Sequence, residues 1–506
     1  MLKFIIRRLG AAIGILFGAS LLLYVLVINS GDPLEDLRES NAENREYLMQ
    51  QRIEFMNLDV PWYQRYWDWL VGVGKCFALQ CDLGTNRSGV SVDSLLALAA
   101  SSTLRLVLLA TILALIVGIA IGILTAIRQY SGLDYGVTFA TFLFFSLPVF
   151  WAAVLLKEYM AIGYNDWLRD PDFTLQQILV IAALAGFLMQ VFLAGSLRRR
   201  IITFAATAVF IGAALPTLLA LGYFREPRLG FIGVAVLTFA VALSATAMSV
   251  GLKTKKVLYP ALITAALVSV LQIVLVNVFV YYMNWWIMAA GLVLAFVIPW
   301  FIGRSMGGRY KDLAAGVSMI TGVVGAGLTV LDHFFRSWPG FLDLKPRPIS
   351  TIGSQTPNFA GGFWETALDY GTQLVLPTIL LTVISLASYS RYTRASMLEV
   401  SRQDYIRTAR SKGLPERTVI FRHAFRNALI PIATIAAFDF AALIGGAVIT
   451  ETVFGWKGMG ELFITGLNQV DPAPVMAFFL VTGTAAILFN LLADIFYAIL
   501  DPRIRV

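Results

Sequence analysis

The chain has 506 residues, of which 58% are hydrophobic and 14% charged, and its formal net charge is +8 at pH 7. Its mean hydropathy of +0.75 exceeds what the core of a water-soluble domain can use, which excludes soluble enzymes and binding modules. The excess of Lys and Arg does not indicate nucleic-acid binding, because membrane proteins collect basic residues in their cytoplasmic loops. We therefore count membrane spans, at about 20 apolar residues each.

The N-terminal residues MLKFIIRRLG lead into an apolar run that ends at Ile28. A secretory signal peptide has a shorter apolar region, of about 7–15 residues, followed by a small-residue cleavage site. We expect an uncleaved first membrane helix.

Twelve apolar runs are long enough to cross a bilayer, which predicts an all-α polytopic membrane protein of about twelve transmembrane helices. They lie near residues 9–29, 102–127, 135–160, 178–196, 201–223, 229–251, 257–282, 285–303, 313–334, 374–394, 429–450 and 475–499.

The distribution of charge supports this count. If the N-terminus is cytoplasmic, the short inside segments carry 24 of the 39 Lys and Arg residues, as cytoplasmic loops do. The loop 30–101 then lies outside, with eleven Asp and Glu against six Lys and Arg. Both termini are expected to be cytoplasmic.

The two cysteines, Cys76 and Cys81, fall in this outer loop. Paired cysteines usually bond in an oxidising compartment, so we expect a disulfide, with two free thiols as the alternative. The two histidines, His333 and His423, cannot complete a set of metal ligands with them, and no metal site is expected.

Six apolar helices joined by short turns lie between about 175 and 335, with almost no charge at membrane depth. An even number of added helices leaves the sidedness of the following segments unchanged. We therefore expect residues 166–340 to be an inserted, lipid-facing region between the two parts of a six-helix core, 1–165 and 341–506. Gln190 and Asn277 are its notable polar residues, expected to form hydrogen bonds between helices.

A long basic inside loop, 391–431, follows the tenth span. Its segment from Asp404 to Lys412 predicts a short helix that Gly413 ends in a left-handed conformation, and Pro415 can open the next helix. Tyr405, Ala409 and Lys412 share one face of that helix. An ordinary solvated loop could have the same composition.

This loop closely resembles the EAA loop of binding-protein-dependent (ABC) importer permeases, in the version of oligopeptide, dipeptide and nickel importers. Arg407 and Thr408 occupy the first two EAA positions, as is usual in the peptide branch. Further resemblances occur in the family's order, cover about 1–165 and 365–506, and point to the first, B-type permease of a pair. They are Met1–Gly10, Leu58–Leu70, Ser146–Trp151, Glu451–Gly460 and Leu500–Arg505.

The resemblance implies that the short helix couples the chain to a cytoplasmic ATPase. It also implies an outer re-entrant loop between Glu451 and Gly460, in the inner membrane of a bacterium. The coupling residues would be Asp404, Tyr405, Arg407, Thr408, Ala409, Lys412 and Gly413, and those of the re-entrant loop Glu451, Phe454, Trp456 and Gly460.

The implied partners are a second homologous permease, two ATP-binding subunits, an extracytoplasmic substrate-binding protein or lipoprotein, and membrane lipids. ATP and Mg would be used by the ATPase subunits, and this chain would bind no cofactor and catalyse no reaction. The expected cargo is a peptide, with nickel as the alternative within the family. No nucleic acid is expected.

Asp439 lies near the middle of the span 429–450. An ionised carboxylate that faces lipid costs about 2.5–3.5 kcal/mol, so Asp439 is expected to face the protein interior or a water-filled path. It would contact the ammonium group of a peptide, or it would be protonated or paired internally. Lys157 and Glu158 lie towards the outer end of their span and are interpreted as structural.

Two other functions remain as alternatives. A self-contained secondary transporter would show matching halves and ionisable groups at the midplane, and Asp439 alone supplies little of this. A membrane glycosyltransferase could use acidic residues of the outer loop, such as Glu35 and Asp36. The sequence has no phosphate-binding G-x-x-x-x-G-K-[ST] motif, which agrees with ATP hydrolysis on partner chains.

Overall fold

A computed structural model describes the backbone of residues 2–193 and 195–500, and their side chains except those of residues 2–9, 417, 430, 437, 441, 444–446 and 493–500. Over these residues the chain is helical, and no strand is present beyond an isolated bridge between Thr85 and Ser91. The predicted all-α class is confirmed. The side chains of the motif Met1–Gly10 up to residue 9, and the C-terminal motif from Asp501 on, lie outside the described residues.

The chain forms two compact units. The first contains Met1–Ile162, Ser350–Ser354 and Gln373–Val506, and the second contains Gly163–Ile349 and Gln355–Thr372.

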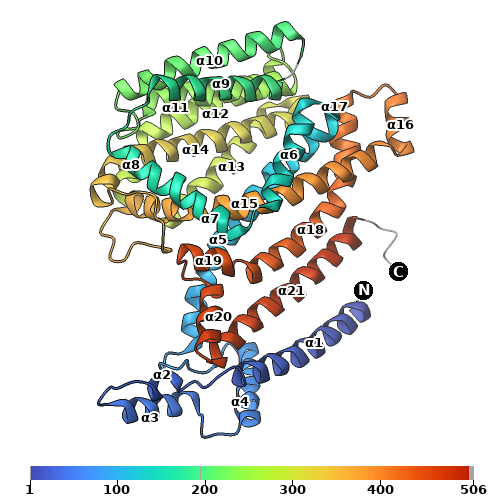
Figure 1. Ribbon diagram of the computed structural model, residues 1–506. Coiled ribbons are helices and arrows are strands. Elements are labelled where there is room, and N and C mark those ends of the chain that lie inside the picture. The colour runs from blue at the N-terminus through green and yellow to red at the C-terminus, as the bar shows by residue number, and fades with distance from the viewer. Residues whose placement is uncertain (1, 194, 501–506) are drawn as a thin grey trace. The chain divides into compact units, whose positions relative to one another are not determined.

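The first unit (Figure 1) contains both ends of the described chain. Its helices are α1 Leu2–Ile28, α2 Glu35–Arg38, α3 Arg45–Met56, α4 Trp62–Lys75, η1 Cys76–Ala78, α5 Val92–Ile127, α6 Gly132–Ser146, α7 Val149–Leu155, the π-helical η2 Leu156–Gly163, most of α15 Phe363–Ser401, α16 Asp404–Ser411, α17 Glu416–Thr418, the π-helical η5 Val419–Ala424, α18 Phe425–Gly446, α19 Val448–Phe454, α20 Met459–Asn468 and α21 Pro472–Leu500.

The second unit contains the helices between residues 163 and 349, together with the first ten residues of α15. Its helices are α8 Tyr164–Arg169, α9 Leu175–Leu193, α10 Leu197–Ala220, α11 Gly230–Ser249, α12 Lys255–Val274, η3 Val278–Tyr282, α13 Trp285–Met306, η4 Gly308–Tyr310 and α14 Lys311–Leu344.

Ten helices in the described part of the chain are long and apolar enough to span a membrane, or eleven if α6 and α7 form one bent span. The predicted span 135–160 corresponds to a bent pair, because α6 and the helix that follows it meet at 105°. Pro148 disfavours helical backbone at the preceding residue, and Leu147 is extended (φ −75°, ψ 126°). The remaining predicted span, 429–450, overlaps α18, which contains the shorter apolar stretch Pro431–Phe440.

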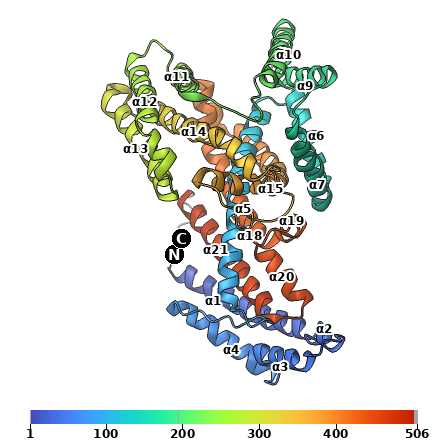
Figure 2. The same ribbon diagram turned by 90° about the vertical axis from the view of Figure 1, so that its left-hand side faces the viewer.

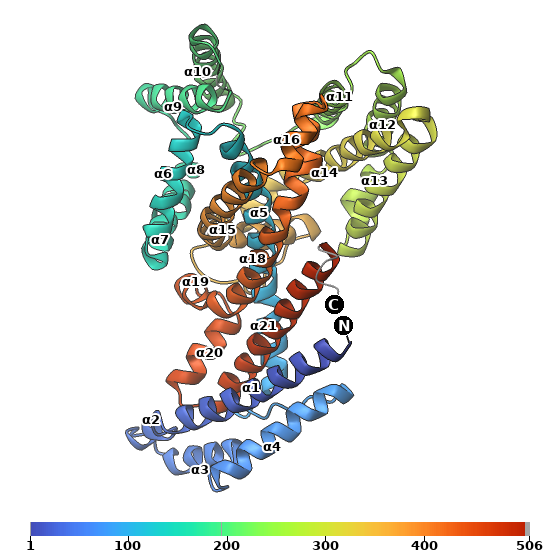
Figure 3. The same cartoon turned by 90° about the vertical axis from the view of Figure 1, so that its right-hand side faces the viewer.

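The first unit depends on a close crossing of α5 and α15. A Cβ atom on Gly118 would lie 2.7 Å from Tyr389 Cβ, and one on Gly122 would lie 2.5 Å from Thr393 Cβ. Membrane helices approach each other closely where their contact residues are small. On other sides α5 packs against α18, α20 and α21, and α21 packs along α1 (Figure 3).

Helices of the second unit also approach each other closely at glycine residues. In it α14 packs against α11, α12 and α13, and α9 packs against α10. A Cβ atom on Gly322 of α14 would lie 2.2 Å from Pro299 Cγ of α13, and one on Gly303 would lie 2.4 Å from the Ala314 carbonyl oxygen. The α9–α10 pair stands apart from α11–α14 (Figure 2).

We predict that Gly122→Ala lowers the free energy of unfolding by about 1–3 kcal/mol, because the added methyl group overpacks the contact with Thr393. The control is Gly136→Ala on α6, where a Cβ atom meets nothing within 4 Å and alanine favours the helix by about 1 kcal/mol. Thermal unfolding of both variants in detergent measures the difference. Equal melting temperatures would contradict the close crossing.

Candidate functional site

The basic loop contains a short helix with defined ends. Gln403 adopts an extended conformation (φ −70°, ψ 149°) and precedes α16. At the other end Gly413 has φ +73°, so the predicted left-handed conformation is confirmed. The amide of Gly413 donates to the Arg410 carbonyl (2.9 Å) and that of Leu414 to the Ala409 carbonyl (3.4 Å). This pair of backbone hydrogen bonds is typical of helices that end at a residue in the left-handed conformation.

One face of α16 is buried against the first unit. Ile406 and Ala409 belong to a cluster that includes Ile123 of α5 and Met397 of α15. Ala409 is only 7% exposed, so the prediction that it shares an outward contact surface with Tyr405 is wrong. A small residue is needed here because α16 packs on its own chain. The outward face instead presents the exposed Asp404, Tyr405, Arg407, Thr408 and Lys412.

Polar contacts brace the loop. The Arg410 guanidinium makes two hydrogen bonds to Glu416 (2.7 and 3.2 Å), and these lower the pKa of the Glu416 carboxyl. Asn427 Nδ2 donates to the hydroxyl of Tyr405 (2.7 Å). Arg407 and Asp404 approach only to 3.6 Å on the exposed surface, where an ion pair contributes little.

A buried ion pair fixes the end of α15 next to this loop. The Arg394 guanidinium donates to both carboxylate oxygens of Asp134 on α6 (2.8 and 2.9 Å), and Asp134 is buried. Such bidentate pairs are geometrically specific. This pair was not predicted from the sequence. The local pattern near Asp134 indicates only the start of α6, where the Ser131 hydroxyl accepts from the Asp134 amide (3.3 Å).

Asp439 has a partner inside the first unit. The hydroxyl of Tyr389 on α15 donates to Asp439 Oδ2 on α18 (2.7 Å), and Tyr389 is fully buried. The carboxylate therefore points towards α15.

The predicted outer residues meet around one buried carboxylate. Glu451 accepts hydrogen bonds from Thr103 Oγ1 (2.6 Å), the Gly460 amide (2.7 Å) and the Glu461 amide (3.2 Å). The two amides belong to the first turn of α20, where helix amides lack partners. A Cβ atom on Gly460 would lie 2.9 Å from Glu451 Oε2, so glycine is required for the approach.

Phe454 and Trp456 lie in the same segment as Glu451 and Gly460, and both are buried. Trp456 Nε1 donates to the Ser102 carbonyl (3.3 Å), and Gly455 between them has φ +54°. The ammonium group of Lys157 donates to the Val453 carbonyl and lies 5.3 Å from the centre of the Phe454 ring. A cation is favourable at this place because it is the C-terminus of α19.

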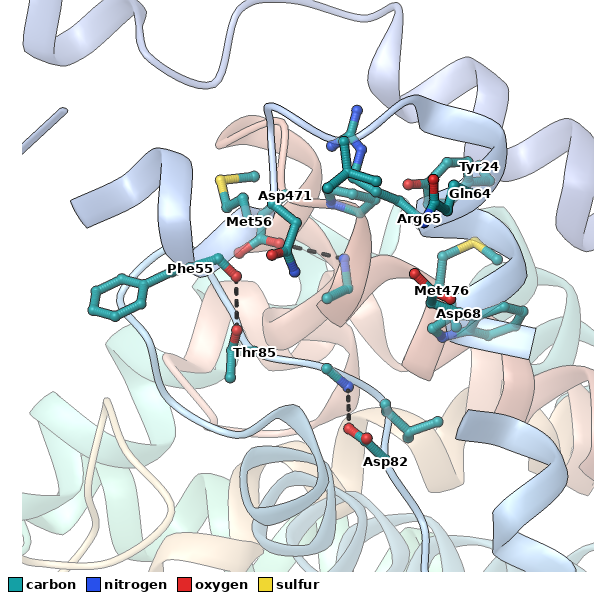
Figure 4. A pocket seen from close by; sticks show the side chains of 17 residues that line it. Tyr24, Phe55, Met56, Gln64, Arg65, Asp68, Asp82, Thr85, Asp471 and Met476 are labelled. Atoms are coloured by element: carbon teal, nitrogen blue, oxygen red, sulfur yellow. Dashed lines mark hydrogen bonds between the residues drawn. The ribbon is translucent and has the colours of Figure 1, made fainter. Parts of the chain in front are cut away.

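Cys76 and Cys81 are bonded to each other in the loop between α4 and α5. Near them a cavity of about 350 Å³ lies between α4 and the start of α21 (Figure 4). Asp471 lines it and accepts from the Arg87 and Ala473 amides (2.7 and 3.3 Å), while burial raises the pKa of its carboxyl.

In the second unit a carboxylate is buried near the end of the predicted span 313–334. Asp332 of α14 is fully buried, and it accepts from the Gly230 amide (2.7 Å) and from Arg336 (2.8 Å). Gln272 is buried beside it, whereas Asn277 is exposed and Gln190 half-buried. The carboxylate is tolerated because it satisfies amides at the start of α11.

No group of three or more His, Cys, Asp or Glu residues that could hold a metal ion occurs in the described part of the chain. The residues described above provide a helix with a polar exposed face, an ion pair, and buried carboxylates that hold helices together.

Residues 318–506 match the family model of the binding-protein-dependent transport system inner membrane component. The oligopeptide transport system permease protein OppB of Mycobacterium tuberculosis is 45% identical over 181 residues, which are 36% of this chain and 54% of that relative. The chain thus matches about half the length of this relative.

A putative peptide permease protein of Brucella suis is 34% identical over 228 residues, which are 40% of this chain and 70% of the relative. The oligopeptide transport system permease protein AppB of Bacillus subtilis is 25% identical over 511 residues that span both chains. On these matches and on its apolar helices, the chain belongs to the family of inner-membrane components of binding-protein-dependent transport systems.

Proposed function

We propose that the chain is the transmembrane permease subunit of an ATP-driven importer of peptides, in which it forms half of the translocation pathway. The observation that carries the proposal is α16, a short helix that ends at the left-handed Gly413 and packs on α5 and α15 through Ile406 and Ala409. Its other face is polar and exposed. This is a rigid surface through which a cytoplasmic ATPase can push on two long helices.

The partners follow from this role. A second homologous permease supplies the other half of the pathway, two ATP-binding subunits use ATP and Mg, and an extracytoplasmic substrate-binding protein delivers the cargo. The chain itself binds no cofactor and is not an enzyme. It lies in the inner membrane of a bacterium with both termini cytoplasmic. Its relatives include oligopeptide, dipeptide and peptide permeases, which supports peptides as cargo.

The coupling surface consists of Asp404, Tyr405, Arg407, Thr408 and Lys412, while Ala409 and Gly413 maintain the shape of the helix. Asp439 contributes a carboxylate to the pathway, and Tyr389 holds it in place (2.7 Å). Glu451, Phe454, Trp456 and Gly460 form the outer closure. The region 166–340 is a structural insertion. In it Asp332 accepts hydrogen bonds from backbone amides and does not contact cargo.

We predict that Arg407→Glu abolishes uptake and weakens the pull-down of ATPase chains at least about tenfold, a loss of about 1.4 kcal/mol. The side chain of Arg407 is 72% exposed, so the change leaves the fold intact and alters only the offered surface. Arg402→Glu, an exposed charge reversal in the same loop before α16, is the control. Normal pull-down and uptake by the Arg407 variant would refute the coupling role.

We predict that Gly413→Val lowers uptake several-fold while Gly413→Asn is nearly normal. A Cβ atom at this position meets nothing within 4 Å, so only the backbone conformation is at stake. A left-handed residue costs about 1–2 kcal/mol for valine, whereas asparagine adopts this conformation readily. Uptake and ATPase pull-down are measured for both variants. Equal behaviour would mean that the end of α16 has no part in coupling.

We predict that Asp439→Asn weakens uptake of peptides with a free N-terminal ammonium group more than uptake of N-acetylated peptides. The change removes a charge at nearly constant shape. Tyr389→Phe, which removes only the hydrogen-bond donor, is the control and should not alter this ratio. Equal loss for both kinds of peptide would assign Asp439 a purely structural role.

A further inference from the structure

The outer loop ends in a covalently closed tip that exposes two large hydrophobic side chains. After α4 the chain turns through Cys76–Ala78, and the bond between Cys76 and Cys81 closes six residues. Within them Phe77 is 94% exposed and Leu79 is 95% exposed. We call residues 76–81 the closed tip.

Leu79, in the closed tip, adopts an unfavourable backbone conformation. Its φ is +59°, a region that bulky side chains rarely occupy and that glycine or asparagine would occupy at lower cost. A leucine in this conformation whose side chain is 95% exposed points to a use of that side chain outside its own chain.

The position of the closed tip relative to the bilayer follows from counting residues along α5. This count rests on the proposed cytoplasmic position of the basic loop. Ile119 and Ile123 pack with the cluster that contains Ile406 and Ala409, at the cytoplasmic edge. About 20 residues of helix cross the hydrocarbon core, which places its outer edge near Ala99. The sulfur-bearing side chain of Cys76 packs on the cluster that contains Val92. At about 1.5 Å per residue, Val92 lies about 10 Å beyond that edge.

This level is the headgroup region of the outer leaflet. From there, apolar side chains reach the boundary of the acyl chains, about 5–10 Å deep, as in peripheral amphipathic anchors. Lys75 and Asp82 flank the tip and are both largely exposed, with their charged groups 3.8 Å apart. Charged residues of this kind belong among polar headgroups.

We propose that the closed tip inserts Phe77 and Leu79 into the outer leaflet of the bilayer. It is then a second attachment of the extracytoplasmic helices α2–α4 to the membrane, besides α1. Since α4 also contacts α1, where the Tyr66 and Ser20 hydroxyls are 2.9 Å apart, the two attachments fix the tilt of this region.

The test places a photoreactive diazirine analogue of leucine at position 79 of the full chain. The protein is reconstituted in vesicles of phosphatidylethanolamine and phosphatidylglycerol and irradiated, and adducts are identified by mass spectrometry. We expect lipid adducts on the peptide that contains position 79, several-fold above those obtained with the same analogue at Tyr47. Tyr47 is an exposed aromatic residue of α3, at 63%, outside the apolar spans.

Three results would overturn the proposal. They are adducts to another polypeptide, absence of adducts, and equal lipid labelling at positions 79 and 47. Labelling requires neither ATPase subunits nor uptake, so its failure is distinct from failure of the Arg407→Glu test of the importer function.

Discussion

The close approach of α5 and α15 at Gly118 and Gly122 is the contact on which the other features of the first unit depend. With α15 held at this distance, Tyr389 is buried and its hydroxyl reaches Asp439 on α18. One turn further on, Arg394 meets Asp134 of α6, and Met397 joins the cluster that holds α16. A larger side chain at either glycine would displace all three contacts together, because one rigid helix carries them.

Both units tolerate buried carboxylates by supplying backbone amides. Glu451 accepts from two amides at the start of α20, and Asp332 accepts from the Leu229 and Gly230 amides at the start of α11. An unpaired buried charge would be strongly unfavourable. Amides of the first helical turn lack intrahelical partners and lie at the positive end of the helix dipole. The same arrangement thus stabilises the carboxylate and fixes where the helix begins.

This use of buried charge bears on how the molecule can work. Asp134 accepts hydrogen bonds from Arg394. Glu451 accepts from Thr103 and backbone amides, and Asp332 accepts from Arg336 and backbone amides. A secondary transporter needs ionisable groups that change partners at the midplane. Among the described residues, these three carboxylates have fixed partners, so they do not supply the exchanging groups that such a transporter needs.

The sequence by itself determined the helical class, the apolar segments, the left-handed Gly413 and the resemblance to a permease family, because these depend on composition and on local backbone preferences. It did not determine which way Ala409 faces, the bend before Pro148, or the partners of Glu451, Asp439 and Arg394. The side-chain pairs among them are separated by 50 to more than 300 residues, as with Tyr389 and Asp439 or Thr103 and Glu451. Only the packing of helices in three dimensions brings such residues together, and a hydrogen bond depends on atomic distances that no local pattern encodes.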